Sequence, residues 1–431
     1  MRDSSVVSIA KVNEKAIPFG TGLDTDLQDF ATSPEVARLP FATAEPLLCS
    51  LSFDELEELY QRAEARDPGF QRPNLERYYR EVTFRNDEEL EAAAQLLEEL
   101  YPVGRYGEFP VRAAPVIASC VPPRERFMIP PHLLGNNTIG KFRVALIERG
   151  WEINGVGRHP GLEHLELETS GVPRFGEEGE HGVAALGVLA GIRASSPFGI
   201  YPNPAKVVIA AIDRAKTCTN NIADAICWSL TKLSAGDVIL VEVQKETAGC
   251  VVPVEVEHAI ANAISLATAL GITVIEPAAN GRMRLDAQLN LPGLRQPFLS
   301  DSGAIVIGAG MFINGKWHRD DCTNYGPRID CFGPGDPTHT FGNYPVADPD
   351  GFTDPEQMMT CGFSNTSAAA ALIAGIALIV QDAAQRRFGA PFHPKVLRHL
   401  LRDPRNGVEC APREEVGVMP QFEKLAANIF D

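Results

Sequence analysis

The sequence lacks a hydrophobic run long enough for a membrane span, and it lacks a recognisable signal peptide. A transmembrane helix needs about twenty apolar residues, whereas the run at residues 368–380 has 13 apolar or glycine residues. The first 20 residues contain no apolar segment of the length that a signal peptide requires. We therefore expect an intracellular, cytoplasmic protein, with secretion by another route as the alternative.

Motifs with paired cysteines are also absent. Nine cysteines are scattered along the chain without a C-x-x-C pair, so the sequence indicates neither a zinc site nor a compact disulfide framework. Most of these cysteines are expected to be small buried hydrophobic residues. In an oxidising compartment, Cys322 could pair with Cys331, or Cys218 with Cys227.

Positive charge is scarce relative to negative charge. Lys and Arg number 39 against 56 Asp and Glu, a formal net charge of −17, which argues against a nucleic acid or an anionic membrane as partner. A neutral or cationic partner is easier to accommodate. With 431 residues, the chain is long enough for one large domain with additions or for two domains.

Short β-branched runs alternate with helix-length segments from about residue 140 onward. The runs have the composition of strands buried on both faces, at residues 143–147, 206–212, 237–243, 271–275 and 304–310. Helical patterns lie between them at residues 182–194, 219–234 and 255–270. This order predicts an α/β fold, a doubly wound and mostly parallel sheet with helices on both faces. Functional residues are then expected at the carboxyl ends of the strands.

The first 139 residues do not follow this alternation. We divide the chain into an N-terminal extension (1–75), a small α+β domain (76–118), a linker (119–139) and the main domain (140–431). Residues 1–50 are predicted to be irregular, whereas Ser52 and Glu55 fit the capped start of a helix at 52–65. The small domain is expected to contain a strand at 77–84, a helix at 86–101 and a returning strand at 104–112.

Ser367 lies at the head of the apolar run, near the N-terminus of a predicted buried helix. Two interpretations compete. A serine there is a common N-cap. The free N–H groups at a helix start also suit a nucleophile whose reaction creates an oxyanion. Taken alone, capping is the commoner role.

Three other polar residues stand at the ends of predicted elements. Glu148 follows the strand at 143–147, where a carboxylate must be paired, either in a structural ion pair or to orient a cation or imidazolium. His181 opens a segment rich in Gly and Ala, which suits an ordinary helix start or a rigidly held base. Asn280 precedes a glycine after a strand, which is typical of a turn but also suits an amide donor to an oxyanion.

The order Glu148, His181, Asn280, Ser367 combines four chemical roles. An acid orients an imidazole, the imidazole takes the serine proton, and an amide stabilises the tetrahedral oxyanion. Acyl transfer needs all four roles at one point. The combination favours Ser367 as a nucleophile over Ser367 as a cap.

At these residues the chain resembles the subtilases, the subtilisin-like serine peptidases. The family's serine motif is matched at 365–375, its histidine motif at 181–187, and its acid motif at 147–150 with a His-Pro-x-Leu at 159–162. Asn280 falls where the family has its oxyanion-hole asparagine. Glu148 stands in place of the usual Asp, and Asn365 and Ala371 replace a Gly and a Pro. Asn tolerates a positive φ, and Ala is a better helix former than Pro.

The resemblance implies a subtilisin-like fold from about residue 140 and a serine endopeptidase. Glu148, His181 and Ser367 would be the catalytic residues, and the Asn280 side chain with the Ser367 backbone N–H would form the oxyanion hole. The substrate-binding positions that it implies are Val241, Glu242, Val243, Gln244, Ala278 and Ala279. A peptide or protein substrate would lie extended along an exposed strand edge. Residues 77–112 resemble a degenerate propeptide, a domain that would assist folding and occupy the substrate cleft of a zymogen.

Several consequences of the resemblance stay open. No organic cofactor is implied, and although calcium ions stabilise many subtilases, no acidic loop has suitable ligand spacing. Glu242 could face the first specificity pocket and select a basic side chain, or face away towards solvent or a loop. The acyl group could pass to an amine or alcohol, as in a ligase or cyclase. The chain could also be a non-catalytic peptide-binding relative.

Overall fold

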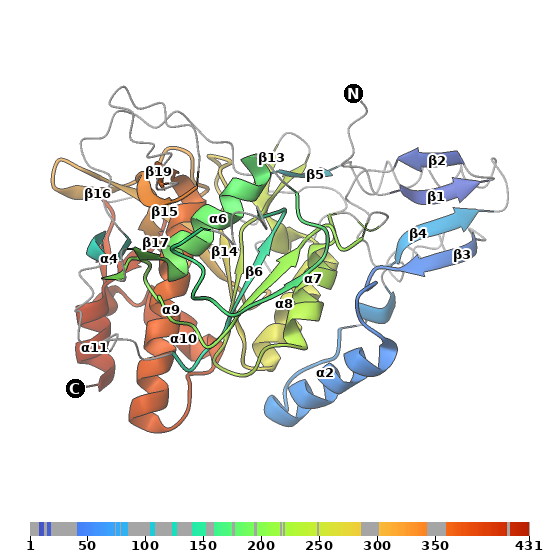
Figure 1. The fold of residues 1–431 in the computed structure, drawn as a ribbon, viewed down its shortest axis with the longest axis horizontal. Helices are drawn as coiled ribbons and strands as arrows, with labels where there is room; N and C mark the ends of the chain where they lie inside the picture. Colours follow the sequence, from blue (N-terminus) through green and yellow to red (C-terminus); the bar gives the residue numbers. More distant parts are fainter. Residues whose placement is uncertain are drawn as a thin grey trace.

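A ten-stranded sheet is the largest sheet among the residues that the computed structural model describes. The described residues are 8–12, 15–18, 41–73, 75–77, 79–84, 104–107, 123–126, 140–151, 159–174, 177–193, 196–215, 218, 220–247, 250–285, 301–342, 359–411 and 414–430. Nine strands lie side by side in the order β20 (Gly407–Glu409), β21 (Val418–Pro420), β17 (Cys331–Pro334), β15 (Ile305–Ile313), β14 (Thr273–Pro277), β11 (Val238–Val241), β6 (Val144–Glu148), β10 (Val207–Ala211) and β7 (Leu167–Ser170). The tenth, β16 (Lys316–Arg319), pairs with β15 (Figure 1).

The sheet is parallel from β21 to β7, and only β20 and β16 run antiparallel to their neighbours. Two buried cores flank it. One face is covered by α6 (Glu177–Ala190), α9 (Asn365–Phe388), α10 (Pro394–Arg402) and α11 (Phe422–Phe430). The other is covered by α2 (Phe53–Arg66), α7 (Ile222–Leu230) and α8 (His258–Ala269). The predicted doubly wound, mostly parallel α/β fold is confirmed.

Alternating side chains on the central strands belong to different cores. On β6, Val144 and Leu146 pack with α6 and α9, whereas Ala145 and Ile147 pack with α7 and α8. The same alternation holds on β11, where Leu240 faces α9 and Val241 faces α8. Side chains alternate along a strand, so the next residue after those named on β6 and on β11 can also be assigned to one face of the sheet.

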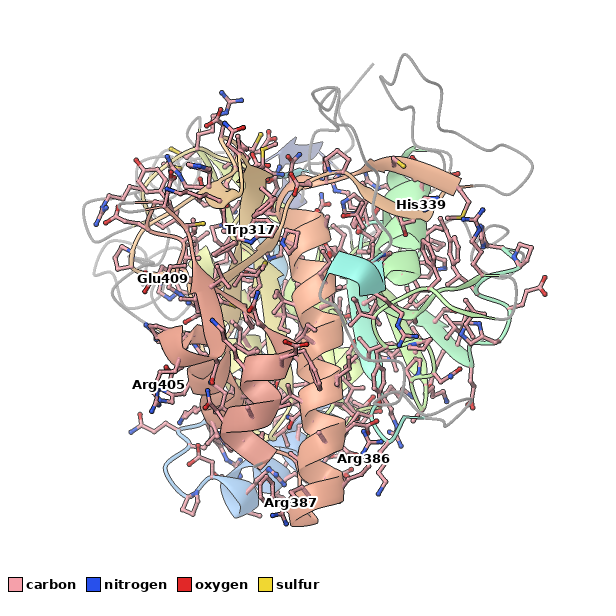
Figure 2. The ribbon with its side chains drawn as sticks, turned by 90° about the vertical axis from the view of Figure 1, so that its left-hand side faces the viewer. Trp317, His339, Arg386, Arg387, Arg405 and Glu409 are labelled. Carbon is pink, nitrogen blue, oxygen red and sulfur yellow. The ribbon has the colours of Figure 1, made fainter. Side chains whose placement is uncertain are left out.

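The helix α9 is the long core helix of its face. By length and composition it could cross a membrane, but 94% of its most apolar window is buried inside the protein. Figure 2 shows α9 running through the molecule, with Arg386 and Arg387 at its far end. A helix that is apolar all round fits this buried position.

The N-terminal strands form a separate sheet. Its order is β2 (Lys15–Pro18), β1 (Ser8–Val12), β4 (Tyr79–Phe84) and β3 (Phe41–Pro46), and it lies on the same side of the molecule as α2 (Figure 1). The prediction of irregular structure up to residue 50 is wrong for three of these strands, which are too short for their alternation to stand out. The sheet also joins strands from both sides of the predicted boundary at residue 75. The helix at 52–65 is confirmed as α2, with the capping box of Ser52 and Glu55.

The predicted returning strand of the small domain pairs with the main domain instead. β5 (Gly104–Gly107) lies antiparallel to β12 (Gln244–Thr247), which pairs on its other edge with β13 (Cys250–Pro253). Local alternation cannot reveal a partner more than a hundred residues away. The remaining residues of that prediction and the helix expected at 86–101 lie outside the described residues.

Short elements complete the described structure. They are the strand pairs β8 (Ile192–Arg193) with β9 (Ser196–Pro197) and β18 (Thr338–Phe341) with β19 (Met359–Phe363), the helix α4 (Pro123–Arg126) in the predicted linker, and 3₁₀ turns at Leu75–Arg77, Val254–Val256 and Pro404–Asn406.

Neither of the two disulfides considered from the sequence, Cys322 with Cys331 or Cys218 with Cys227, is present among the described cysteines. Cys218 instead lies with its Sγ 2.7 Å from the Sγ of Cys49. The chain around Cys49 is held to the start of α7, where the N–H of Ser50 donates to Asp224 at 2.8 Å. This contact anchors the N-terminal extension to the main domain.

A buried ion-pair network supports the loop before β17, and we expect its loss to be costly. Arg328 is buried and lies 2.6 Å from Glu255 and 3.0 Å from Asp330. Arg328→Met should lower the free energy of unfolding by about 3 kcal/mol, because it leaves buried carboxylates short of a partner. Urea denaturation measures this. The matched change at Arg284, whose ion pair with Glu415 is exposed, should cost less than about 1 kcal/mol, and equal losses would contradict the prediction.

Candidate active site

Glu148 ends β6 at the point where the strand order reverses. The chain places β7 and β10 on one side of β6 and β11 on the other, and such switch points form crevices at the carboxyl ends of strands. Glu148 is fully buried, and by alternation it shares the face of Val144 and Leu146, which α6 and α9 cover. Its Oε1 accepts the Arg149 N–H at 2.8 Å, and its Oε2 lies 2.6 Å from His181 Nδ1.

His181 lies in the second turn of α6 and does not open it, because the helix begins at Glu177. The ring is buried, and its Nε2 lies 3.0 Å from Ser367 Oγ. Gly182 explains how the helix comes so close to β6. A Cβ at this position would lie 2.4 Å from the Gly150 carbonyl oxygen and 3.2 Å from Glu148 Cγ. Only glycine at position 182 lets α6 come this close to β6, and this approach brings His181 within reach of Glu148.

Ser367 is the third residue of α9, and Ser364 is the N-cap. The capping interpretation of Ser367 is therefore wrong, since its hydroxyl is instead directed at His181. Asn365 adopts a φ of +60°, the left-handed conformation that asparagine was expected to tolerate. The Ser367 N–H is among the first N–H groups of the helix, which have no partner within the helix.

Asn280 presents a free amide donor beside Ser367. Its side-chain Oδ1 accepts a hydrogen bond from the Thr366 hydroxyl at 2.9 Å, and its backbone N–H donates to Gln244 Oε1 at 3.1 Å. The Nδ2 atom is buried and has no hydrogen-bond partner among the described residues. Ala279, directly before it, has a φ of +68°, a strained conformation for a residue other than glycine. The strained backbone at Ala279 and the hydrogen bond to Oδ1 thus fix the Asn280 side chain, which leaves Nδ2 as a donor without a partner among the described residues.

Thr366 is the residue that the sequence interpretation missed. Its hydroxyl donates a hydrogen bond to Asn280 Oδ1, which fixes the orientation of the amide and leaves Nδ2 available as a donor. Its position next to Ser367 was the available signal, but the partner 86 residues away was not visible in the sequence.

The structure brings Glu148, His181, Asn280 and Ser367 together in the arrangement that acyl transfer requires. The imidazole can accept the Ser367 proton on Nε2 while Nδ1–H donates to the Glu148 carboxylate. The Asn280 amide and the N–H groups at the start of α9 can donate to an oxyanion. No group of three or more His, Cys, Asp or Glu that could hold a metal ion was found in the described part of the chain.

The six residues expected to bind substrate are all fully buried: Val241, Glu242, Val243, Gln244, Ala278 and Ala279. Val241 and Val243 face α7 and α8, on the far side of the sheet from Ser367. At the end of this segment, β5 and β13 occupy the two edges of β12. Because β5 belongs to the propeptide-like segment at 77–112, which was expected to occupy the cleft, an exposed strand edge for substrate stays a prediction.

Glu242 follows β11 and is fully buried, so the interpretation in which it faces solvent is wrong. It continues the alternation of Val238 and Leu240, whose side chains pack under α6 and α9. Burial raises the pKa of its carboxyl group well above the ordinary value, and His181, Glu148 and the Ser367 hydroxyl also act on this pKa. Alternation along the strand therefore places the side chain on the same face of the sheet as the site.

The comparisons with known proteins identify a family. The model of the subtilase family matches residues 177–415, more than half of the chain. No curated protein sequence matches the chain.

Similar solved structures share the fold at low sequence identity. A mutant of the protease domain of PatA is 19% identical with a TM-score of 0.50, over 69% of this chain and 99% of that one. Fervidolysin from Fervidobacterium pennivorans, described as a keratinolytic enzyme related to subtilisin, is 13% identical with a TM-score of 0.53, over 91% of this chain and 64% of that one. The PatG macrocyclase in complex with peptide is 16% identical with a TM-score of 0.50, over 73% of this chain and 100% of that one.

Proposed function

We propose that this chain, which belongs to the subtilase family, is a serine endopeptidase that hydrolyses peptide bonds through an acyl-enzyme on Ser367. One observation carries the proposal. His181 lies 2.6 Å from the Glu148 carboxylate through Nδ1 and 3.0 Å from Ser367 Oγ through Nε2. A buried relay of this geometry has the parts of an acid–base–nucleophile triad.

The proposed reaction begins when Ser367 Oγ attacks the peptide carbonyl carbon and its proton passes to His181 Nε2. Glu148 stabilises the imidazolium through Nδ1–H, and the oxyanion receives hydrogen bonds from Asn280 Nδ2 and the Ser367 N–H. The C–N bond then breaks, and the proton on His181 leaves with the amine. Water repeats the sequence on the acyl-enzyme and releases the carboxylic acid. The residues named supply every proton and charge, so the steps need no organic cofactor or metal.

A diverse peptide library, with products identified by mass spectrometry, tests the function. We expect new carboxyl and amino termini that carry the elements of one water molecule. Products in which the acyl group is joined to an amine or alcohol would favour the second candidate, a ligase or cyclase. The shared fold with both the PatA protease domain and the PatG macrocyclase suits either acceptor. No product from any peptide would favour the non-catalytic alternative.

We expect loss of the Thr366 hydroxyl to impair the oxyanion hole. Thr366→Val keeps the shape but removes the shorter of two hydrogen bonds to Asn280 Oδ1, the one at 2.9 Å, and leaves the Thr366 N–H at 3.5 Å, so the amide is held less firmly. This should lower kcat about tenfold with little change in KM. Steady-state kinetics measure it. The control is Thr273→Val on β14, where the buried hydroxyl has no hydrogen-bond partner among the described residues. Similar kcat values in the two variants would contradict the role given to Thr366.

The N-terminal segment is proposed to act as the propeptide-like partner of the site, with β5 on the β12 edge where substrate would pair. Consecutive N–H groups of a strand point to opposite sides, so proline at both Arg105 and Tyr106 removes a donor to β12 whichever residue supplies it. If β5 competes with substrate, the initial rate of peptide hydrolysis should rise about tenfold. An unchanged or lower rate in a folded variant would show that β5 does not compete.

A further inference from the structure

A second carboxyl group lies beside the proposed nucleophile. The Glu242 N–H donates to the Ile147 carbonyl at 2.9 Å, which places it next to Glu148 across two parallel strands. Its side chain lies on the face that α6 and α9 cover, where the N-terminal parts of these helices bring His181 and Ser367. The triad described above leaves this side chain without a role.

Neither carboxyl oxygen of Glu242 makes a hydrogen bond of ordinary geometry to a described residue, and the residue is fully buried. A buried carboxylate without partners is costly, so such a group takes up a proton. The pKa of the Glu242 carboxyl group is raised well above its ordinary value, which agrees with a protonated side chain. Burial raises it most, the ring of His181 opposes that rise, the Glu148 carboxylate adds to it, and the Ser367 hydroxyl opposes it.

We propose that Glu242 is a positioning residue, held protonated, whose carboxyl O–H, without a partner among the described residues, turns to donate to Ser367 Oγ and thereby directs the serine proton to His181. A serine hydroxyl donates one hydrogen bond and accepts others. A neighbouring acid that donates to Oγ leaves His181 Nε2, 3.0 Å away, as the acceptor of the serine proton.

An ionised Glu242 would have the opposite effect. It would accept the serine proton in competition with His181, and it would place a second negative charge beside the developing oxyanion. The groups facing it are Glu148 from β6, His181 from α6 and the Ser367 hydroxyl from α9. On the neighbouring strand β14, Glu276 lies on the opposite face with Val274 and Glu255, so it does not contribute. The reactivity of Ser367 should therefore fall at alkaline pH.

The proposal rests on the proposed function, since it assumes that Ser367 is the nucleophile. The test measures the rate at which the full chain reacts with a fluorophosphonate without charged groups, as a function of pH. We compare the wild type with Glu242→Gln, which mimics the neutral acid, and Glu242→Ala, which removes the donor. Glu409→Gln is the matched control, because Glu409 is exposed on the edge strand β20 (Figure 2).

In the wild type and the Glu409→Gln control, labelling should fall about tenfold for each pH unit above the pKa of Glu242. In Glu242→Gln it should stay within about threefold of the wild type at neutral pH and lose the alkaline fall. Glu242→Ala should be slower at every pH. Parallel profiles for wild type and Glu242→Gln would overturn the proposal.

An infrared measurement separates failure of this proposal from failure of the proposed function. The carbonyl band of a protonated carboxyl group should be present in the wild type at neutral pH and reduced in Glu242→Gln. An unchanged band in Glu242→Gln would overturn the proposal whether or not the protein is active. If the band is present but Ser367 reacts in no variant at any pH, the proposed function fails and the positioning role fails with it.

Discussion

Ser367→Ala should lower kcat for peptide hydrolysis by about 10⁶-fold while leaving the fold unchanged. The variant removes the hydroxyl that lies 3.0 Å from His181 Nε2, so no acyl-enzyme can form on Ser367. Effects of this size are expected when the nucleophile of a triad is removed, and the remaining rate comes from the oxyanion hole and from binding. Initial rates of peptide cleavage and near-UV circular dichroism measure the two parts of the prediction.

The control for this prediction is Ser364→Ala at the N-cap of α9. Its side chain makes no capping hydrogen bond, so the variant should keep both its activity and its stability. If Ser367→Ala retained more than about a hundredth of the activity, another residue would be the nucleophile.

Glu148→Gln should lower kcat by about 10⁴-fold. The carboxylate accepts from His181 Nδ1 at 2.6 Å in a fully buried setting, which fixes the tautomer and stabilises the imidazolium. The amide of the glutamine carries no charge to stabilise the imidazolium, and it can hold the His181 ring in the wrong tautomer. The measurement is kcat as a function of pH, with KM expected to change little.

The matched comparison is Glu148→Asp, which restores the charge on a side chain shorter by one methylene. It should retain more activity than Glu148→Gln, because a small shift of the His181 ring can make up for the shorter side chain, whereas nothing in Glu148→Gln replaces the lost negative charge. Unchanged turnover in Glu148→Gln would mean that a different acid orients His181, and Glu242 would then be the nearest candidate.

The central fold could be predicted because its signals are local. A strand buried on both faces reads as a continuous apolar run, and such runs predicted β6, β10, β11, β14 and β15 to within a few residues. The apolar run after Ser367 predicted α9 for the same reason. Where signals were short, prediction failed, as for β1, β2 and β3.

The candidate site was predictable as a set of residue types, since each stood at the end of a predicted element and matched a family motif. Its fine geometry was not. The pairing of Thr366 with Asn280 joins residues 86 apart, and the approach of α6 to β6 depends on contacts of Gly182 that only the fold creates. The direction of Glu242 could have been read from its alternation with Leu240, but only once the face of each strand was assigned.

Pairing between distant segments accounts for the remaining differences. β5 has a strand-like pattern that fits any free edge, so its sequence could not select β12 over β4. The consequence is functional, because β5 lies on the edge of β12 where we propose that substrate pairs.

Mass-spectrometric mapping of a fluorophosphonate adduct identifies the nucleophile directly. The reaction should be run on the full chain and on the variant with proline at Arg105 and Tyr106, so that cover by β5 is controlled. We expect one adduct, on Ser367, that forms far more slowly in Glu148→Gln. An adduct on another residue, or none in either protein, would contradict it.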